Sequence, residues 1–296
     1  MRAFLETLRS FWTKFWFRPA SPLGLIAVRA LLAGNALWIV LSRPGLPSLV
    51  NWPPEFWARV DRQLAIRYLI MHLPAGAETA LFLLLNVSLA FAMIGVLPRL
   101  SCLLSGLLLY HFAPFENIIW HAMGPYFSGL TLPTLGLIVL GVAQIPHFDS
   151  EWSPEYRWPL ALVQLILSFN YAFAAISKMR TVGGFGWVSA ENLRGMALTS
   201  MTWETPPPLA AWVASSPAAC WTIAAVTMVV ECLFILVPFS KIAAGILVPL
   251  ALIGHLGIIM VLGIVFLSLP CLLIYLDWDA IATKVGRPRA PMIHRA

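Results

Sequence analysis

Lys178 ends a long apolar stretch of the sequence and is preceded by polar residues at helical spacing. Tyr171 lies seven residues before it and Gln164 fourteen. Because one helical turn takes 3.6 residues, these three side chains share one face of a helix. A polar face is costly in lipid, so we expect it to meet partners or a water-filled cavity inside the protein. Burial favours the uncharged form of a lysine, and Lys178 could then act as a base.

Two histidines could assist that chemistry. Lys178 and both histidines also have a purely structural interpretation. Lys178 could instead extend its amine to the lipid headgroups. His255 lies between Gly254 and Gly257, where helices can approach closely. It could relay a proton or simply donate a hydrogen bond across a helix bundle. His121 follows Trp120 at the predicted outer entrance to a membrane span, where it could be catalytic or purely structural.

Arg29 and Glu231 are further ionisable residues in apolar stretches. A charged side chain at the centre of a bilayer costs about 2.5–3.5 kcal/mol or more, so each needs a partner. We predict that they form a structural ion pair. The sequence has no HxxxH or HxxE pattern and no glycine-rich phosphate loop, so no metal is predicted.

The elements that carry these residues are membrane helices, as the composition of the 296-residue chain indicates. Hydrophobic residues make up 60% of it and charged residues 11%, against about 25% charged residues in soluble domains. A folded soluble domain of this size still exposes to water roughly a quarter of the surface area that its unfolded chain exposes. That fraction is too large for so apolar a chain. We therefore predict an all-α integral membrane protein.

A helix needs about 20 apolar residues to cross the hydrocarbon layer. This length predicts about eight membrane-spanning helices, of which the third and eighth are short, so that seven remain possible. The predicted spans are 23–42, 77–97, 100–115, 124–145, 158–178, 219–239, 242–261 and 264–277. Aromatic and basic residues alternate at helical spacing over 1–18, which predicts an interfacial amphipathic helix. The predicted domains are this helix, a helical bundle over 19–279 and a basic tail over 280–296.

The positive charge, +6 in total, lies mainly in the two tails. Cytoplasmic segments of membrane proteins are enriched in Lys and Arg. We therefore predict that both termini are cytoplasmic, in a multi-pass protein of the cell inner (plasma) membrane that contacts anionic lipids. No separate basic domain is present, so nucleic acid is not an expected partner.

Short motifs along the chain resemble the membrane domain shared by the vitamin K-dependent γ-carboxylase and the bacterial HTTM proteins, which include relatives of sporulation-delaying protein B. The resemblance covers about residues 20–278. The residues that carry it are Pro22-Leu23-Gly24, Arg29, Gly34, His121, Tyr126 to Leu130, Tyr171 to Lys178, Trp187, His255 and Gly263 to Phe266.

The resemblance implies that Lys178 is the base that removes a proton from a reduced quinone. His121 and His255 would then polarise the substrate or relay the proton. Tyr171 and Gln164 would then contact the cofactor. It suggests a lyase or carboxylase-like enzyme that modifies a secreted peptide. No segment like the large lumenal domain of the carboxylase follows residue 278, so a second protein subunit could supply that surface. A non-catalytic maturation or assembly factor, and a permease or quinone-associated respiratory subunit, stay open as alternatives.

Overall fold

The computed structural model is built from helices and describes residues 2–42, 73–120, 129–181 and 183–286. Helices make up 80% of it, and no strand occurs in these ranges. The predicted all-α class is therefore confirmed. Two compact units divide the chain: unit 1 comprises residues 1–163 and 276–296, and unit 2 comprises residues 164–275.

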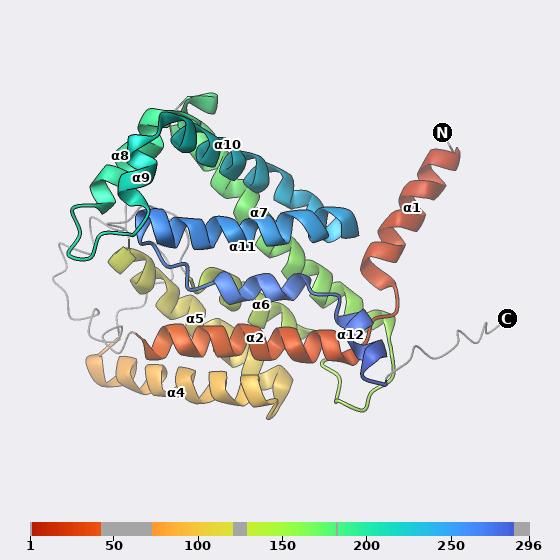
Figure 1. Cartoon of the computed structure of the whole chain (residues 1–296). Coiled ribbons are helices and arrows are strands. Elements are labelled where there is room, and N and C mark those ends of the chain that lie inside the picture. Colours follow the sequence, from red (N-terminus) through yellow and green to blue (C-terminus); the bar gives the residue numbers. More distant parts are fainter. Residues whose placement is uncertain (1, 43–72, 121–128, 182, 287–296) are drawn as a thin grey trace. The chain divides into compact units, whose positions relative to one another are not determined.

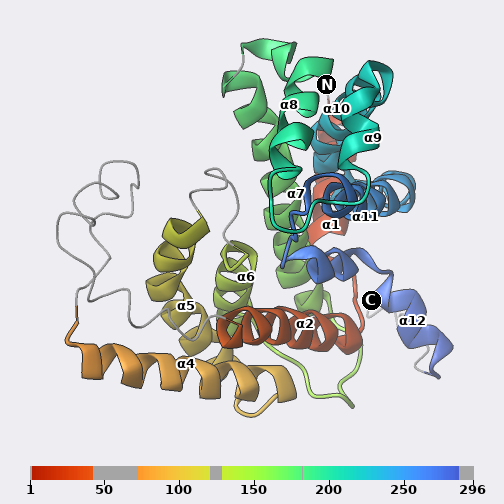
Figure 2. The same cartoon turned by 60° about the vertical axis from the view of Figure 1, so that its left-hand side comes forward.

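The described part of unit 1 contains five complete α-helices, a short 3-10 helix and a C-terminal helix, which are labelled in Figures 1 and 2 where there is room. They are α1 (Arg2–Phe17), α2 (Pro22–Leu41), α4 (Ala75–Ile94), α5 (Pro98–Trp120), α6 (Thr131–Val142), η3 (Pro154–Tyr156) and α12 (Trp278–Lys284). α7 (Arg157–Thr181) begins in unit 1 and continues into unit 2. The other elements of unit 2 are η4 (Gly184–Trp187), α8 (Ala190–Ser200), α9 (Ala210–Ser215), α10 (Pro217–Leu233), η5 (Phe234–Phe239), α11 (Lys241–Leu262) and η6 (Leu269–Tyr275).

Among the described residues, five helical segments are long and apolar enough to cross a membrane, which fits a multi-pass membrane protein. They are Pro22–Leu41, Gly76–Ile94, Pro154–Thr181, Pro217–Phe239 and Lys241–Leu262. The predicted count of about eight is not confirmed. α6 has 12 residues and is about 18 Å long, while η6 has seven and is about 14 Å long. Both are short of the roughly 30 Å of hydrocarbon in a bilayer.

Local sequence explains where several of these helices begin and end. The hydroxyls of Ser216 and Ser240 accept hydrogen bonds from the first turns of α10 and α11, where the backbone N–H groups have no helical partner. Gly95 and Gly263 follow the last residues of α4 and α11 with φ of 88° and 67°. Glycine adopts this left-handed conformation without a steric penalty.

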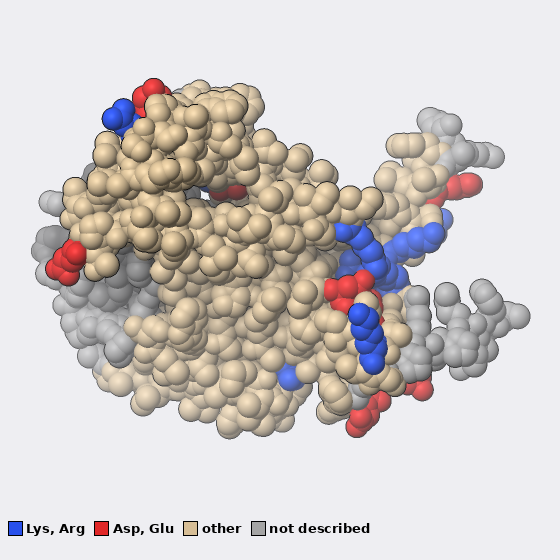
Figure 3. All heavy atoms as spheres, viewed as in Figure 1, with Lys and Arg blue, Asp and Glu red and all other residues tan. Residues whose placement is uncertain are grey.

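The outer faces of the long helices expose large apolar side chains. On α11, Ile242 and Ile253 are 77% and 64% exposed, and on α4, Leu83 is 61% exposed. In Figure 3 the visible surfaces of α2 and α4, and those of α10 and α11, are almost without charged atoms. Such continuous apolar surface is unusual on soluble proteins and is compatible with contact with lipid.

Within unit 1, α5 and α6 approach each other closely, and glycines make this possible (Figures 1 and 2). A Cβ atom added to Gly141 would lie 2.7 Å from backbone and Cβ atoms of Leu103, and one added to Gly106 would lie 2.9 Å from the backbone nitrogen of Ile138. Small residues at such crossings are typical of membrane helices, because they let backbones pack against each other.

We predict that Gly141→Val lowers the free energy of unfolding by about 1–3 kcal/mol, because extra atoms at this contact force the two helices apart. Titration with sodium dodecyl sulfate in mixed micelles, followed by circular dichroism, would measure the loss. Gly245→Ala in α11 is the control, since nothing lies within 4 Å of its added Cβ. Equal stability of Gly141→Val and the wild type would contradict the prediction.

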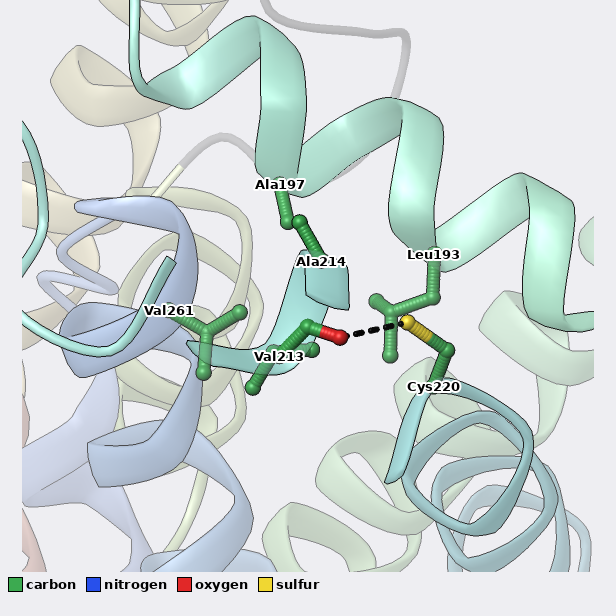
Figure 4. Close-up of a cluster of buried hydrophobic side chains, with 6 residues drawn as sticks. All are labelled: Leu193, Ala197, Val213, Ala214, Cys220 and Val261. Carbon is green, nitrogen blue, oxygen red and sulfur yellow. Dashed lines mark hydrogen bonds between the residues drawn. The ribbon is translucent and has the colours of Figure 1, made fainter. Parts of the chain in front are cut away.

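The core of unit 2 is formed where α8, α9, α10 and α11 meet (Figure 4). Its buried members are Leu193, Ala197, Val213, Ala214, Cys220 and Val261. The Cys220 thiol lies 3.1 Å from the carbonyl oxygen of Val213, to which it donates a weak hydrogen bond. This cluster packs α8 and α9, which connect α7 to α10, against α10 and α11.

Candidate functional site

Lys178, near the C-terminal end of α7, forms an ion pair and hydrogen bond with Glu231 of α10. The side chains are 23% and 13% exposed, so the pair is mostly enclosed by protein. The ammonium group also lies over the ring of Trp187 in η4, 4.8 Å from its centroid. An aromatic face attracts a cation in this position. Lys178 is therefore held by two partners within unit 2.

Two turns earlier on α7, Tyr171 meets the histidine of α11. Its hydroxyl oxygen lies 2.7 Å from Nε2 of His255. The Tyr171 ring stacks on Phe234, with centroids 4.0 Å apart, and Phe266 packs against the imidazole at 4.6 Å. Flat rings on both sides fix the orientation of the Tyr171–His255 pair, and the surroundings of the hydrogen bond are apolar.

The remaining polar residues of this α7 face have partners from η6. The Tyr275 hydroxyl donates to the backbone carbonyl of Gln164 at 2.7 Å. Since that hydroxyl has a single hydrogen, the Ser168 hydroxyl at 2.6 Å donates to Tyr275. The Gln164 side-chain amide donates to the carbonyl of Ile274 at 3.1 Å. The polar face expected from the sequence is thus directed into unit 2 along four turns of α7.

Two buried polar atoms in this region have no hydrogen-bond partner: Oε2 of Glu231 and Nδ1 of His255. If the Tyr171 hydroxyl donates to Nε2, the neutral imidazole has its proton on Nδ1. The site then offers one acceptor and one donor to a bound molecule. Figure 3 shows a hollow in the surface of unit 2, between α10 and α11, with acidic and basic atoms at its bottom. Buried groups without partners are costly, which makes them candidates for ligand contacts.

The structure describes four of the five residues predicted for the catalytic and cofactor site. Lys178, Tyr171, Gln164 and His255 all lie in unit 2, on α7 and α11. His121 lies outside the described residues. Within unit 2 the cation that Glu231 binds is Lys178. The predicted pair of Glu231 with Arg29 would join residues of different units and stays a prediction.

Sequence reasoning missed a second buried pair of ionisable side chains, His111 and Glu78, which lies in unit 1. Nε2 of His111 on α5 lies 3.1 and 3.0 Å from the two carboxylate oxygens of Glu78 on α4. The Glu78 side chain is fully buried. Each residue is an ionisable group in a predicted span, and the two spans are consecutive. That combination was a sufficient signal to propose the pair.

Metal ligands and relatives of the chain were both sought as guides to the function of the site. In the part of the chain that the structure describes, no three His, Cys, Asp or Glu side chains gather closely enough to hold a metal ion. No family model matches the chain, and no curated protein and no solved structure is detectably similar to it. The residues of the site are therefore the basis on which a function is inferred.

Proposed function

We propose that this protein is a multi-pass enzyme of the inner membrane in which Lys178 removes a proton from a lipid-soluble reduced quinone. The observation that carries the proposal is the enclosed Lys178–Glu231 pair, with a free carboxylate oxygen on Glu231 and an unpartnered Nδ1 on His255. The resemblance to the γ-carboxylase and HTTM membrane domain also points to Lys178 and His255, and in addition to His121, whereas Glu231 is not part of it.

Glu231 explains how Lys178 could be a base even though it forms an ion pair. In surroundings of low dielectric constant, an amine beside a carboxylic acid avoids the desolvation of two separate charges. Once the pair is in this uncharged form, the Lys178 amine has a free electron pair. It accepts the proton of a hydroquinone hydroxyl, whose O–H bond breaks, and the hydroquinone is left as an anion.

The unpartnered atoms match the two oxygens of such a substrate. One hydroxyl donates toward the Lys178–Glu231 pair, and the second oxygen accepts from Nδ1 of His255. Aromatic rings of Tyr171, Phe234 and Trp187 surround this region. They suit a flat, apolar ring system, because most ligand sites combine apolar walls with a few placed polar groups.

The proposed orientation places the N-terminus in the cytoplasm, with α1 on the membrane surface. Phe4, Leu8 and Trp12 of α1 are between 50% and 69% exposed, and Arg9 and Lys14 lie between them in sequence. An exposed apolar face flanked by basic residues is typical of a helix that lies in the headgroup layer. In this orientation α7 ends on the outer side, where a secreted peptide could be modified.

The experiment that tests the function uses the purified protein in nanodiscs and a short-chain isoprenyl naphthohydroquinone as the probe. Its anion passes two electrons to dioxygen, so hydroquinone and O₂ give quinone and hydrogen peroxide, and oxygen uptake reports proton removal. We predict that Lys178→Arg lowers the uptake rate by about 10²–10⁴-fold, the usual contribution of a base. Arginine retains the positive charge for Glu231 but does not give up its proton.

The control is Lys241→Arg, the same substitution in the first residue of α11, 14 positions and about 21 Å before His255 on that helix. It should behave as the wild type. Oxygen uptake by Lys178→Arg at the wild-type rate would contradict a role as base. A wild-type protein that neither binds nor oxidises the probe would rule out the quinone.

An assembly role remains the second candidate, because unit 2 exposes large side chains outside its long helices. Phe185 in η4 and Trp212 in α9 are 71% and 61% exposed. Aromatic residues of this kind are enriched in the centres of protein interfaces. Co-purification of a partner subunit that is lost in Phe185→Ser and Trp212→Ser, together with no response to the probe, would favour this role.

A further inference from the structure

Arg29 of α2 is buried, and its partners within unit 1 can be followed only among the described residues. It is 7% exposed, and its Nε atom is buried with no hydrogen-bond partner. Within the described residues of unit 1, no carboxylate forms an ion pair with it. An unpaired buried charge costs several kcal/mol. An anion bound at the guanidinium would offset this cost.

The guanidinium of Arg29 lies beside the turn between α4 and α5. A Cβ atom added to Gly95 would lie 2.7 and 2.8 Å from the two terminal guanidinium nitrogens. The absence of a side chain at Gly95 therefore lets the guanidinium reach the end of α4. The carbonyl groups at that end carry partial negative charge, which attracts a cation weakly. This offsets only part of the cost of burial.

The same turn lies where α4 leaves the membrane. Gly95 directly follows the candidate span Gly76–Ile94, and α2 and α4 lie side by side in both views of the fold (Figures 1 and 2). Apolar side chains on the turn are exposed, with Leu97 at 64% and Leu100 at 61%. A cation level with the end of a span, beside exposed apolar residues, suits a lipid headgroup with its acyl chains.

We infer that Arg29 binds the phosphate group of an anionic membrane lipid at the α4–α5 turn. The planar guanidinium presents two parallel N–H donors to phosphate oxygens. Leu97 and Leu100 contact the acyl chains. This role is separate from the site around Lys178, because every residue that it uses belongs to unit 1.

The test is lipid binding by the full-length protein in dodecyl maltoside, measured by native mass spectrometry and by thermal unfolding. Phosphatidylglycerol is the probe, and phosphatidylcholine and inorganic phosphate are the comparison arms. We expect Arg29→Gln to bind phosphatidylglycerol about 10- to 100-fold more weakly, as expected for the loss of a charge-assisted hydrogen bond. We also expect this lipid to raise the unfolding temperature of the wild type but not of the variant.

The matched control is Arg99→Gln, because Arg99 lies on the same turn but is exposed. It should weaken binding less than about fivefold, as an exposed charge contributes little. Equal phosphatidylglycerol binding by Arg29→Gln and wild type would overturn the inference. Stabilisation of the wild type by inorganic phosphate alone would show a soluble anion site and would overturn the lipid as its source. Because Arg29→Gln removes a buried charge, we expect it to remain folded.

Discussion

Glu231→Leu is expected to lower the free energy of unfolding by about 3–5 kcal/mol, the cost of leaving one buried charge of a pair without its partner. The variant leaves Lys178 in largely enclosed surroundings with only Trp187 as a partner. That cation–π contact offsets about 0.5–2 kcal/mol of the loss. Unfolding of the purified protein in mixed micelles, titrated with sodium dodecyl sulfate, would measure the change.

The double variant Lys178→Met with Glu231→Leu separates this loss from a simple packing defect. Replacing both members of a buried pair by apolar residues of similar size is often neutral or stabilising. We therefore expect the double variant to regain most of the stability lost in Glu231→Leu, while oxygen uptake with the hydroquinone probe stays abolished. Additive losses in the two single variants would show that the two charges do not interact in the folded protein.

His111→Leu is expected to cost about 3–5 kcal/mol for the same physical reason, in unit 1. Glu78 is fully buried and both of its carboxylate oxygens are directed at Nε2 of His111. Removing the imidazole leaves an ionisable group in an apolar interior, where it must either stay charged without a partner or take up a proton. Glu78→Leu with His111→Leu should recover the loss.

Tyr110→Phe provides the control for this second pair. It changes the neighbouring residue on α5, whose side chain is 36% exposed, and should alter stability by less than about 0.5 kcal/mol. Oxygen uptake with the probe should be unchanged in folded His111 variants, because this pair belongs to unit 1 and the proposed site to unit 2. A His111→Leu protein as stable as Tyr110→Phe would show that Glu78 does not depend on the histidine.

The site could be predicted in part because helical spacing is a local property. Gln164, Tyr171 and Lys178 were expected on one face of a single helix, and each of them has a partner within unit 2. The identity of those partners could not be predicted. Lys178 and Glu231 are 53 positions apart, and Tyr171 and His255 are 84 apart. Which residues meet over such distances depends on how helices cross and on their register.

The sequence by itself determined that this chain is helical, with segments apolar enough to fit a membrane protein, and which face of α7 is polar. Both follow from local free energies, since the cost of placing a segment in lipid and the direction of its side chains depend only on its own residues. The tertiary structure decided which ions pair, because that depends on packing between distant helices. It also decided which apolar segments are long helices. The stretches 131–142 and 269–275 were apolar enough to be predicted as parts of spans, yet they form a helix of 12 residues and a 3-10 helix of seven.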